Sequence, residues 1–305
     1  MRSRHAIAAI GLAALLLPSA ACRDTQIGYG TETVSAAQQQ APTVALPNKQ
    51  GTYKFAVLGD FGTGSKEQYE LGRQMASVHA RFKYEHVILV GDNLYGSERS
   101  QDFKKKFEEP YKPLLDAGVK FYASLGNHDA REQRFYKPFN MDGKRYYTFN
   151  PNPEVRFFAL ESTYPEPEQI KWFEDELKKS TSHWKIPFFH HPLYSSGERH
   201  GSDIRLRRTI EPMLLASDVS VVFTGHDHFY ERTKPQNGIT YFVVGSGGKL
   251  REGNIDSNSG ITARGLDTDL AFLVAEIDGD LLTFNTISRT GSVADSGVIT
   301  RRPTR

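Results

Sequence analysis

The chain has 305 residues, with 38 Lys or Arg, 36 Asp or Glu, 19 Phe and 14 Tyr. This composition supplies ample material for a core and excludes whole-chain disorder, a coiled coil and a collagen. Residues 1–21 contain Arg2 and Arg4 and no acid, so without them 36 basic residues balance 36 acidic ones. A neutral chain lacks the basic surface that nucleic-acid binding requires, and no nucleic-acid partner is expected.

The N-terminal segment is typical of an export signal. Arg2 and Arg4 precede an apolar run over residues 6–17, which is short for a bilayer span. Small residues then lead to Cys22, the only cysteine, and the segment resembles a bacterial lipoprotein signal, although Ser19 departs from that pattern. The resemblance implies lipidation of Cys22 and a membrane-anchored protein on the periplasmic or cell-surface side. Ordinary signal cleavage is the alternative.

These features predict three parts of the chain: a signal peptide over residues 1–21, a tether over 22–50 and a folded domain over 51–305. The tether is predicted because residues 23–50 show no helical or strand periodicity and are rich in Gln, Thr, Ala, Gly and Pro.

Within the domain, short apolar runs predict strands buried on both faces. They lie at residues 54–58, 86–90, 120–125, 185–189, 219–223 and 239–244. Helices are predicted between several of them from two apolar stripes. The stripes are Leu71, Met75, Val78 and Phe82, and then Ile170, Phe173 and Leu177. Alternating strands and helices favour an α/β fold, in which ligands bind beyond the carboxyl ends of the strands.

Two stretches break this alternation. Residues 146–150 and 155–162 predict one strand pair, and residues 271–277 and 281–288 predict a hairpin around Asp278-Gly279-Asp280. A last short strand is expected near residues 297–301. We therefore expect a mixed α/β architecture, with two packed sheets and helices outside them.

Polar residues of metal-ligand type follow the predicted strands. Asp60 or Asp92 alone predicts no more than a turn. His226 and His228 are more specific, because two histidines two apart on an extended chain point the same way and can share a metal. Five such clusters, each directly after a buried strand, together predict a metal site at the edge of a sheet. The clusters begin at Asp60, Asp92, Asn127, His190 and His226.

The order of these motifs resembles the calcineurin-like metallophosphoesterases, over about residues 51–300. The motifs are Asp60-Phe61-Gly62, Gly91-Asp92-Asn93-Leu94-Tyr95, Gly126-Asn127-His128-Asp129, His190 and Gly225-His226-Asp227-His228. Because Tyr95 is present, the chain looks most like the small, tartrate-resistant purple acid phosphatases. This resemblance implies a four-layer α-β-β-α sandwich with two mixed sheets. It also implies an acid phosphatase, exported in view of the N-terminal segment, that hydrolyses phosphate monoesters through a metal-activated hydroxide.

The resemblance further implies a dinuclear centre of Fe(III) and a divalent metal, which is Fe, Zn or Mn. Seven ligands are implied: Asp60, Tyr95 and His228 for iron, Asp92 as the bridge, and Asn127, His190 and His226 for the divalent metal. The choice of His190 over His191 follows from the family's His-x-Pro pattern before Pro192. Phenolate and carboxylate oxygens suit a trivalent iron, and imidazoles suit a divalent metal.

Two further histidines are candidate catalytic residues. His128 follows Asn127 and is expected to bind phosphate, together with Asn127, or to act as the general acid. His200 is a second candidate for both roles, although its spacing from His190 is one residue longer than in the small phosphatases, and a solvated loop histidine is the alternative. Asp129 is expected to orient His128. The glycines in Gly245-Ser246-Gly247-Gly248 are expected to allow a close backbone approach.

Other functions stay open on the same residues. A phosphodiesterase or a nucleotidase would use the same ligands, because these do not select the leaving group. A non-catalytic surface protein that binds phosphate or metal belongs to a different class, and the complete ligand set disfavours it. The expected substrate is a small phosphate ester.

Overall fold

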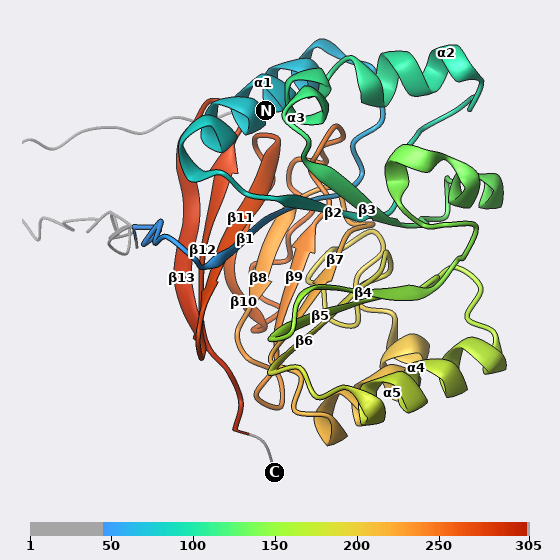
Figure 1. The fold of residues 1–305 in the computed structure, drawn as a ribbon, viewed down its shortest axis with the longest axis vertical. Coiled ribbons are helices and arrows are strands. Elements are labelled where there is room, and N and C mark those ends of the chain that lie inside the picture. Colours follow the sequence, from blue (N-terminus) through green and yellow to red (C-terminus); the bar gives the residue numbers. More distant parts are fainter. Residues whose placement is uncertain (1–44, 304–305) are drawn as a thin grey trace, which may run out of the picture. The chain divides into compact units, whose positions relative to one another are not determined.

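The computed structural model describes residues 45–303. The predicted signal peptide, Cys22 and most of the predicted tether lie outside the described residues. The described chain contains one sheet of six strands and one of seven. Figure 1 shows these sheets in the middle of the fold, with helices on both sides.

The six-stranded sheet has the order β13-β12-β11-β1-β2-β3. Its strands are β1 (Tyr53–Leu58), β2 (His86–Val90), β3 (Lys120–Ser124), β11 (Ala271–Asp278), β12 (Leu281–Ser288) and β13 (Val293–Thr300). β1, β2 and β3 run parallel, whereas β11 is antiparallel to β1 and continues into the hairpin. Asp60, Asp92 and Asn127 all follow the carboxyl ends of the parallel strands.

The seven-stranded sheet has the order β10-β8-β9-β7-β6-β5-β4. Its strands are β4 (Tyr147–Asn152), β5 (Val155–Ala159), β6 (Trp184–Phe188), β7 (Val221–Thr224), β8 (Tyr230–Thr233), β9 (Thr240–Val244) and β10 (Thr262–Leu266). β5, β6, β7 and β9 are parallel. The histidine motifs follow the carboxyl ends of β6 and β7.

The helices lie outside the sheets (Figure 1). They are α1 (Lys66–Phe82), α2 (Ser100–Phe103), α3 (Lys112–Asp116), α4 (Pro167–Lys179) and α5 (Ile204–Ala216), with a π-helical turn at Lys104–Glu108 and 3₁₀ turns at Arg131–Phe135 and Lys137–Phe139. The stripe predicted on α1 is buried along its whole length. On α4, Phe173 and Leu177 are buried and Ile170 is partly buried.

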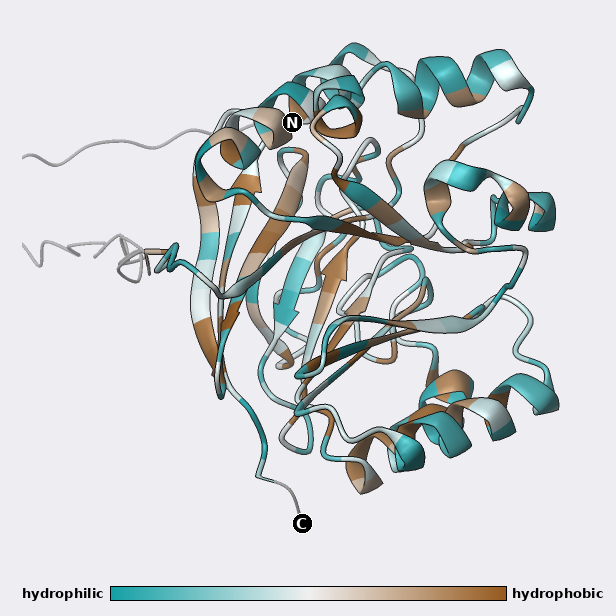
Figure 2. Ribbon diagram, viewed as in Figure 1, coloured by the Kyte–Doolittle hydropathy of each residue, from teal (hydrophilic) through white to brown (hydrophobic). Residues whose placement is uncertain are grey.

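Side chains that alternate along the strands point to opposite faces of each sheet, and they pack either against the other sheet or against a helix. Between the sheets, the ring of Phe55 lies 5.3 Å from that of Phe157, and Phe242 lies 5.0 Å from Phe284. On the opposite face of the seven-stranded sheet, Phe158 packs 5.8 Å from Phe173 of α4. Figure 2 shows hydrophobic residues along the central strands and hydrophilic stretches along the helices. The predicted four-layer α-β-β-α architecture is confirmed.

Five strands and α-helices have no counterpart in the sequence predictions: β8, β10, α2, α3 and α5. β8 reads Tyr-Glu-Arg-Thr and β10 reads Thr-Ala-Arg-Gly-Leu, so neither has the apolar run that predicted the other strands. β8 forms because it pairs with β9 on one side and β10 on the other. α5 contains Pro212, which ordinarily argues against a helix interior.

Residues 48–52 form a strap along the six-stranded sheet, and the strap begins three residues before the predicted start of the domain at Gly51. The carboxylate of Glu276 on β11 accepts hydrogen bonds from the backbone N–H groups of Asn48 (2.6 Å) and Lys49 (2.8 Å), and from the Thr52 hydroxyl (2.7 Å). Glu276 is buried. The chain is therefore bound to β11 before β1 begins.

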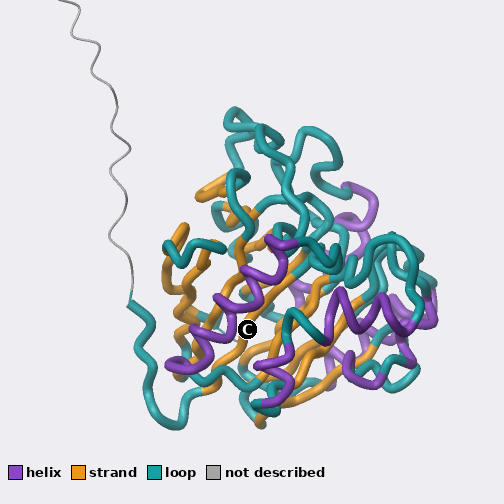
Figure 3. The backbone as a smooth tube through the Cα atoms, turned by 90° about the horizontal axis from the view of Figure 1, so that it is seen from above, coloured by secondary structure: helices purple, strands orange, loops and turns teal. Residues whose placement is uncertain are grey.

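The connections that follow the parallel strands are long and irregular. Figure 3 shows a group of loops beyond one end of the strands. Residues 125–130 follow β3, residues 189–203 follow β6, and residues 245–261 follow β9, all without regular helices or long strands. Such loops on a rigid scaffold are where binding and catalytic residues concentrate.

A partly buried ion pair joins the two sheets at one edge. Asp295 of β13 accepts hydrogen bonds from the Tyr230 hydroxyl (2.7 Å) and from Arg232 Nε (2.7 Å) and Nη2 (3.1 Å) on β8. Its side chain is 6% exposed. Removing one partner of such a pair leaves the others buried without a counter-charge or acceptor.

We predict that Asp295→Ala lowers the free energy of unfolding by about 3–5 kcal/mol, because Arg232 and Tyr230 lose their shared acceptor. Urea denaturation measures this change. Asp280→Ala is the matched control, since Asp280 also pairs with an arginine, Arg301, but is 63% exposed. Its expected loss is at most about 1 kcal/mol. Equal losses in the two variants would contradict the inter-sheet role of Asp295.

Candidate metal centre

Two tight turns place Asp60 and Asp92 side by side. Both residues have φ in the left-handed region, 55° for Asp60 and 49° for Asp92, which Asp tolerates better than most side chains. The N–H of Asp60 donates to the carbonyl of Gly91 at 3.0 Å, so the turns after β1 and β2 are joined directly. Both carboxylates are buried.

His190 enters this site because Gly91 leaves room for it. A Cβ atom on Gly91 would lie 2.6 Å from His190 Nδ1. That Nδ1 lies 2.9 Å from the carbonyl oxygen of Val90. Since a carbonyl only accepts, Nδ1 carries the proton of the neutral ring, and Nε2 presents a lone pair.

The lone pair of His190 Nε2 faces three other nitrogen and oxygen atoms. Asn127 Oδ1 lies 3.1 Å away, His226 Nδ1 3.2 Å and Asp92 Oδ1 3.3 Å. Asn127 Oδ1 and Asp92 Oδ1 can only accept, and lone pairs that face one another in a protein interior are unfavourable unless a proton or a cation lies between them. The donor chemistry therefore fits a divalent metal.

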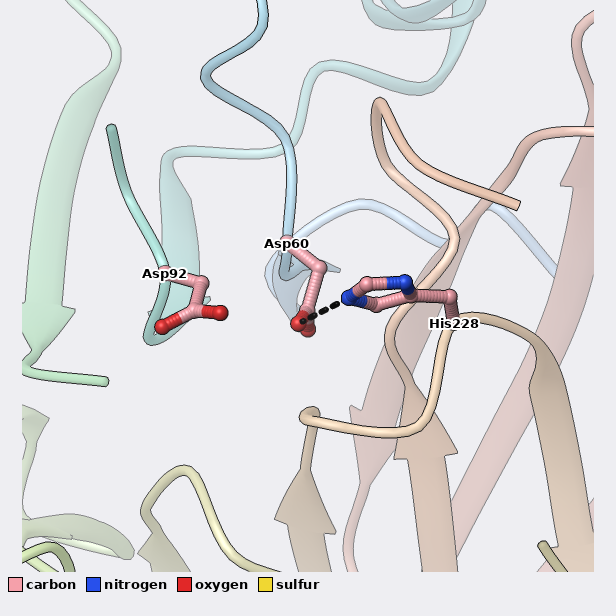
Figure 4. Close-up of side chains that lie close together, drawn as sticks. All are labelled: Asp60, Asp92 and His228. Carbon is pink, nitrogen blue, oxygen red and sulfur yellow. Dashed lines mark ion pairs between the residues drawn. The ribbon is translucent and has the colours of Figure 1, made fainter. Parts of the chain in front are cut away.

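A second group of donors adjoins the first. The Tyr95 hydroxyl donates to Asp60 Oδ1 at 3.1 Å and lies 3.2 Å from His228 Nε2. Figure 4 shows Asp60 between Asp92 and His228, and Asp60 Oδ1 lies 3.6 Å from His228 Nε2. One ligand atom from each of these three residues lies within 4.8 Å of the others, close enough to hold a metal ion.

Burial sets the protonation of the site. Desolvation lowers the pKa of His228 to about 4 and that of His226 to about 2, so their rings are neutral at physiological pH. Burial, and then the charge of Asp92, raises the pKa of Asp60. Burial, followed by the charges of Asp60 and Asp92, also raises the pKa of the Tyr95 phenol. Positive charge in this site would oppose both shifts.

The other predicted histidines lie on two sides of these donors. The ring of His128 lies 5.1 Å from that of Tyr95, and its backbone N–H donates to Asp92 Oδ1 at 3.0 Å. The ring of His200 lies 4.3 Å from that of His226. Both histidines are exposed. His191 bonds through Nδ1 to the Ser162 hydroxyl at 2.9 Å.

Asp129 has a different role from the one expected. Its carboxylate accepts backbone N–H bonds from Gly126 (2.8 Å), Asn93 (3.0 Å) and Leu94 (3.1 Å), together with a bond from the Gln133 side chain (2.8 Å). The prediction that Asp129 orients His128 is therefore wrong. Asp129 instead ties the turn after β3 to the loop between Asp92 and Tyr95.

Sequence reasoning also missed Asp227, which lies between His226 and His228. Its Oδ2 accepts bonds from the Ser195 hydroxyl (2.5 Å) and the Gly201 N–H (3.2 Å). Asp227 therefore holds the loop that carries His200. The sequence signal for such an anchor was an acidic residue directly between two candidate ligands. The cation Lys249, whose Nζ lies 3.8 Å from the centre of the Tyr95 ring, was missed as well.

The glycine run after β9 allows close backbone contact, as expected. A Cβ on Gly247 would lie 2.4 Å from the Gly59 carbonyl oxygen, and one on Gly248 would lie 2.0 Å from that of Phe61. The Gly247 N–H donates to Gly59 O at 2.9 Å. This contact supports the turn that holds Asp60.

Among residues 45–303, no helix combines the length and apolar character that a membrane span requires.

Curated relatives carry purple acid phosphatase names. Purple acid phosphatase 3 of Arabidopsis thaliana is 26% identical over 245 residues, which is 68% of this chain and 66% of the relative. Tartrate-resistant acid phosphatase type 5 of Oryctolagus cuniculus is 24% identical, over 67% of this chain and 77% of the relative. The alignment spans only 53% of another relative, probable purple acid phosphatase 20 of Arabidopsis thaliana.

Solved structures share the fold. Purple acid phosphatase PPD1 from yellow lupin (Lupinus luteus) seeds superposes with a TM-score of 0.68 at 19% identity, covering 85% of this chain and 55% of that chain. A structure described as GAP50, the anchor in the inner membrane complex of Plasmodium, superposes with a TM-score of 0.70 at 18% identity, covering 83% and 90%.

A family profile described as calcineurin-like phosphoesterase matches residues 53–230, which is more than half of the chain. The matched range runs from β1 to the first residue of β8 and includes Asp60, Asp92 and the histidine motifs. The chain belongs to the calcineurin-like phosphoesterase family.

Proposed function

We propose that the protein is an exported, metal-dependent acid phosphatase that hydrolyses phosphate monoesters at a dinuclear Fe(III)–M(II) centre. The observation that carries this proposal is the group of possible metal ligands around His190 Nε2. The other ring nitrogen of His190, Nδ1, donates to the carbonyl of Val90, so Nε2 is free to bind a metal. The purple acid phosphatase names of the relatives support the same activity.

The proposed ligands divide by chemistry. Asp60, Tyr95 and His228 would hold the ferric ion, since carboxylate and phenolate are hard anionic donors. Asn127, His190 and His226 would hold the divalent ion. Asp92 would bridge the two, which is consistent with its contact to His190 and its position beside Asp60 in Figure 4. Mutual distances of 3.1–3.6 Å between the donors support this division.

When bound, the two metals would neutralise the phosphate and lower the pKa of a water that attacks it. The chain's own residues would then position the ester and supply the proton. Asn127 and His128 would bind phosphate oxygens at the turn after β3. His128 and His200 lie on the Tyr95 and His226 sides, respectively, and each is a candidate to protonate the leaving oxygen.

One alternative is a binding protein without turnover, because a protein described as an anchor shares the fold. Diesterase or nucleotidase activity on the same scaffold is another. Assays with p-nitrophenyl phosphate, bis(p-nitrophenyl) phosphate and a nucleoside monophosphate separate these functions. Hydrolysis of none of them by the metal-loaded protein would refute the proposed phosphatase.

We predict that the oxidised protein is purple or pink from charge transfer between the Tyr95 phenolate and iron. Tyr95→Phe should abolish the colour and lower the bound iron, which visible spectroscopy and elemental analysis measure together. Tyr164→Phe is the control, because Tyr164 is 60% exposed and lies outside the donor groups. A colourless wild type fully loaded with zinc or manganese would exclude the iron centre, but not the wider phosphoesterase activity.

We predict that His128→Ala and His200→Ala each lower kcat by about 10²–10⁴-fold on phenyl phosphate, with both metals retained. The loss should be smaller on p-nitrophenyl phosphate, whose leaving group needs little protonation. His190→Ala and His226→Ala should instead lose the divalent metal together with activity.

The control for these variants is His183→Ala, since His183 is exposed and precedes β6, at the end of that strand opposite His190. If His200→Ala keeps the wild-type kcat on both esters, His200 has no catalytic role and is a solvated loop residue. If His128→Ala loses metal, His128 is a metal ligand.

We further propose that Cys22 is lipidated and anchors the protein to a membrane, on the basis of the signal-like residues before it. Cys22→Ser should move the protein from the membrane pellet to the soluble fraction, as judged by fractionation and immunoblotting. The unaltered chain, treated with the same salt and carbonate washes, is the control. A Cys22→Ser protein that stays in the pellet would rule out the lipid anchor.

A further inference from the structure

Lys106 is a buried cation that has no part in the proposed chemistry. It lies in the π-helical turn at Lys104–Glu108, where the preceding lysines, Lys104 and Lys105, are exposed. Only 11% of the Lys106 side chain is exposed. Lysine is almost never buried unless its charge is compensated, so the contacts of this ammonium group indicate what it holds in place.

The Lys106 ammonium group binds the loop that carries Tyr95. Its Nζ donates to the backbone carbonyl oxygen of Tyr95 at 2.7 Å and to that of Ser97 at 2.9 Å. The carboxylate of Asp102 lies farther away, at 3.8 Å, and accepts instead from the Ser97 hydroxyl at 2.8 Å. The short contacts of Lys106 are therefore made to the main chain at and just after Tyr95.

Helix α1 holds the backbone of this π-helical turn. A π turn leaves the ordinary helical hydrogen-bond pattern, and such turns often occur at functional sites. The Gln68 side chain donates to the carbonyl of Lys106 at 2.6 Å, and the Tyr69 hydroxyl donates to that of Lys105 at 2.9 Å. Lys106 thus connects a regular helix, through its backbone, to an irregular loop, through its side chain.

The loop has little regular structure of its own to hold Tyr95. Residues 91–99 contain no helix or strand. The N–H of Tyr95 donates to the carbonyl of Gly62 at 2.9 Å, in the segment that follows Asp60, and its C=O accepts from Lys106. The peptide groups on both sides of the Tyr95 Cα are therefore fixed, with the phenol oxygen 3.1 Å from Asp60 Oδ1 and 3.2 Å from His228 Nε2.

We propose that Lys106 is a positioning residue for Tyr95, which it holds where the phenol oxygen can share a metal ion with Asp60 and His228. Lys106 does not itself touch the metal or the substrate. Without its ammonium group, two carbonyl oxygens lose a charged donor and the loop can carry the phenol away from the other ligands. This inference rests on the proposed function, because that proposal makes Tyr95 a ligand of the ferric ion.

The first test follows metal loss from Lys106→Met, which keeps the length of the side chain and removes its charge and donors. A chelator is added to the metal-loaded protein, elemental analysis follows both metals, and visible spectroscopy follows the Tyr95–iron band. The variant should lose iron about tenfold faster than the wild type, the effect of one charge-assisted hydrogen bond, and its band should shift or weaken. Loss of the divalent metal should change less, since Asn127, His190 and His226 lie on other loops.

Two variants control for charge and for position. Lys106→Arg keeps a cation with several donors and should retain most of the iron. Lys104→Met removes an exposed lysine from the same turn and should behave as the wild type. Urea denaturation checks that each protein is folded, and Lys106→Gln replaces Lys106→Met in the comparison if the latter does not fold.

A double-mutant cycle separates positioning of Tyr95 from a general loss of structure. If Lys106 acts through Tyr95, the double variant Lys106→Met/Tyr95→Phe should lose metal no faster than Tyr95→Phe alone, as measured by elemental analysis. An effect on the whole fold would instead add a further tenfold in the double variant. Such additivity, wild-type metal retention in Lys106→Met, or wild-type retention in Tyr95→Phe would each overturn the inference.

The same cycle distinguishes failure of this inference from failure of the proposed function, because it measures bound metal and not turnover. If no ester is hydrolysed but the two substitutions are coupled, Lys106 positions Tyr95 and the phosphatase proposal fails. If p-nitrophenyl phosphate is hydrolysed but the effects of the two substitutions add, only the positioning role fails.

Discussion

The convergence of lone-pair donors in a buried site is the constraint on which the rest of this structure depends. The Nδ1–H group of His190 donates a hydrogen bond to the carbonyl of Val90, and Asp60 and Asp92 are buried on adjacent turns. The lone pairs and negative charges of these side chains repel one another unless a cation lies between them. The fold keeps it in place through backbone bonds, such as the one from Asp60 to Gly91, and through glycines at positions where any side chain would collide.

The donors come from both sheets, so packing between the sheets determines the geometry of the site. Asp60, Asp92 and Asn127 follow strands of the six-stranded sheet, whereas the histidines follow strands of the seven-stranded sheet. Rings such as Phe55 and Phe157 hold the sheets together from within. Because close-packed interiors transmit small displacements, a change of volume in this aromatic layer alters the separation of donors on opposite sides.

Much of this arrangement could be predicted from the sequence, because its signals are local. A run such as residues 86–90 indicates a buried strand by itself, and the polar residues after it indicate the strand end. The long-range contacts could not be predicted. β8 forms through pairing with its neighbours, Asp129 accepts N–H groups from a distant loop, and Lys249 meets Tyr95 only after the chain has folded. None of these contacts has a periodic pattern, since each depends on tertiary structure.

The strap at residues 48–52 has a mechanical consequence. Three donors from the strap converge on the buried carboxylate of Glu276, at the amino end of β1, whereas Asp60 follows the carboxyl end of the same strand. A six-residue strand is about 20 Å long. Tension applied to the chain before residue 48 is therefore borne by these hydrogen bonds and by β11, one strand length away from Asp60. A pull on the N-terminal side therefore loads the strap before it reaches the turn that holds Asp60.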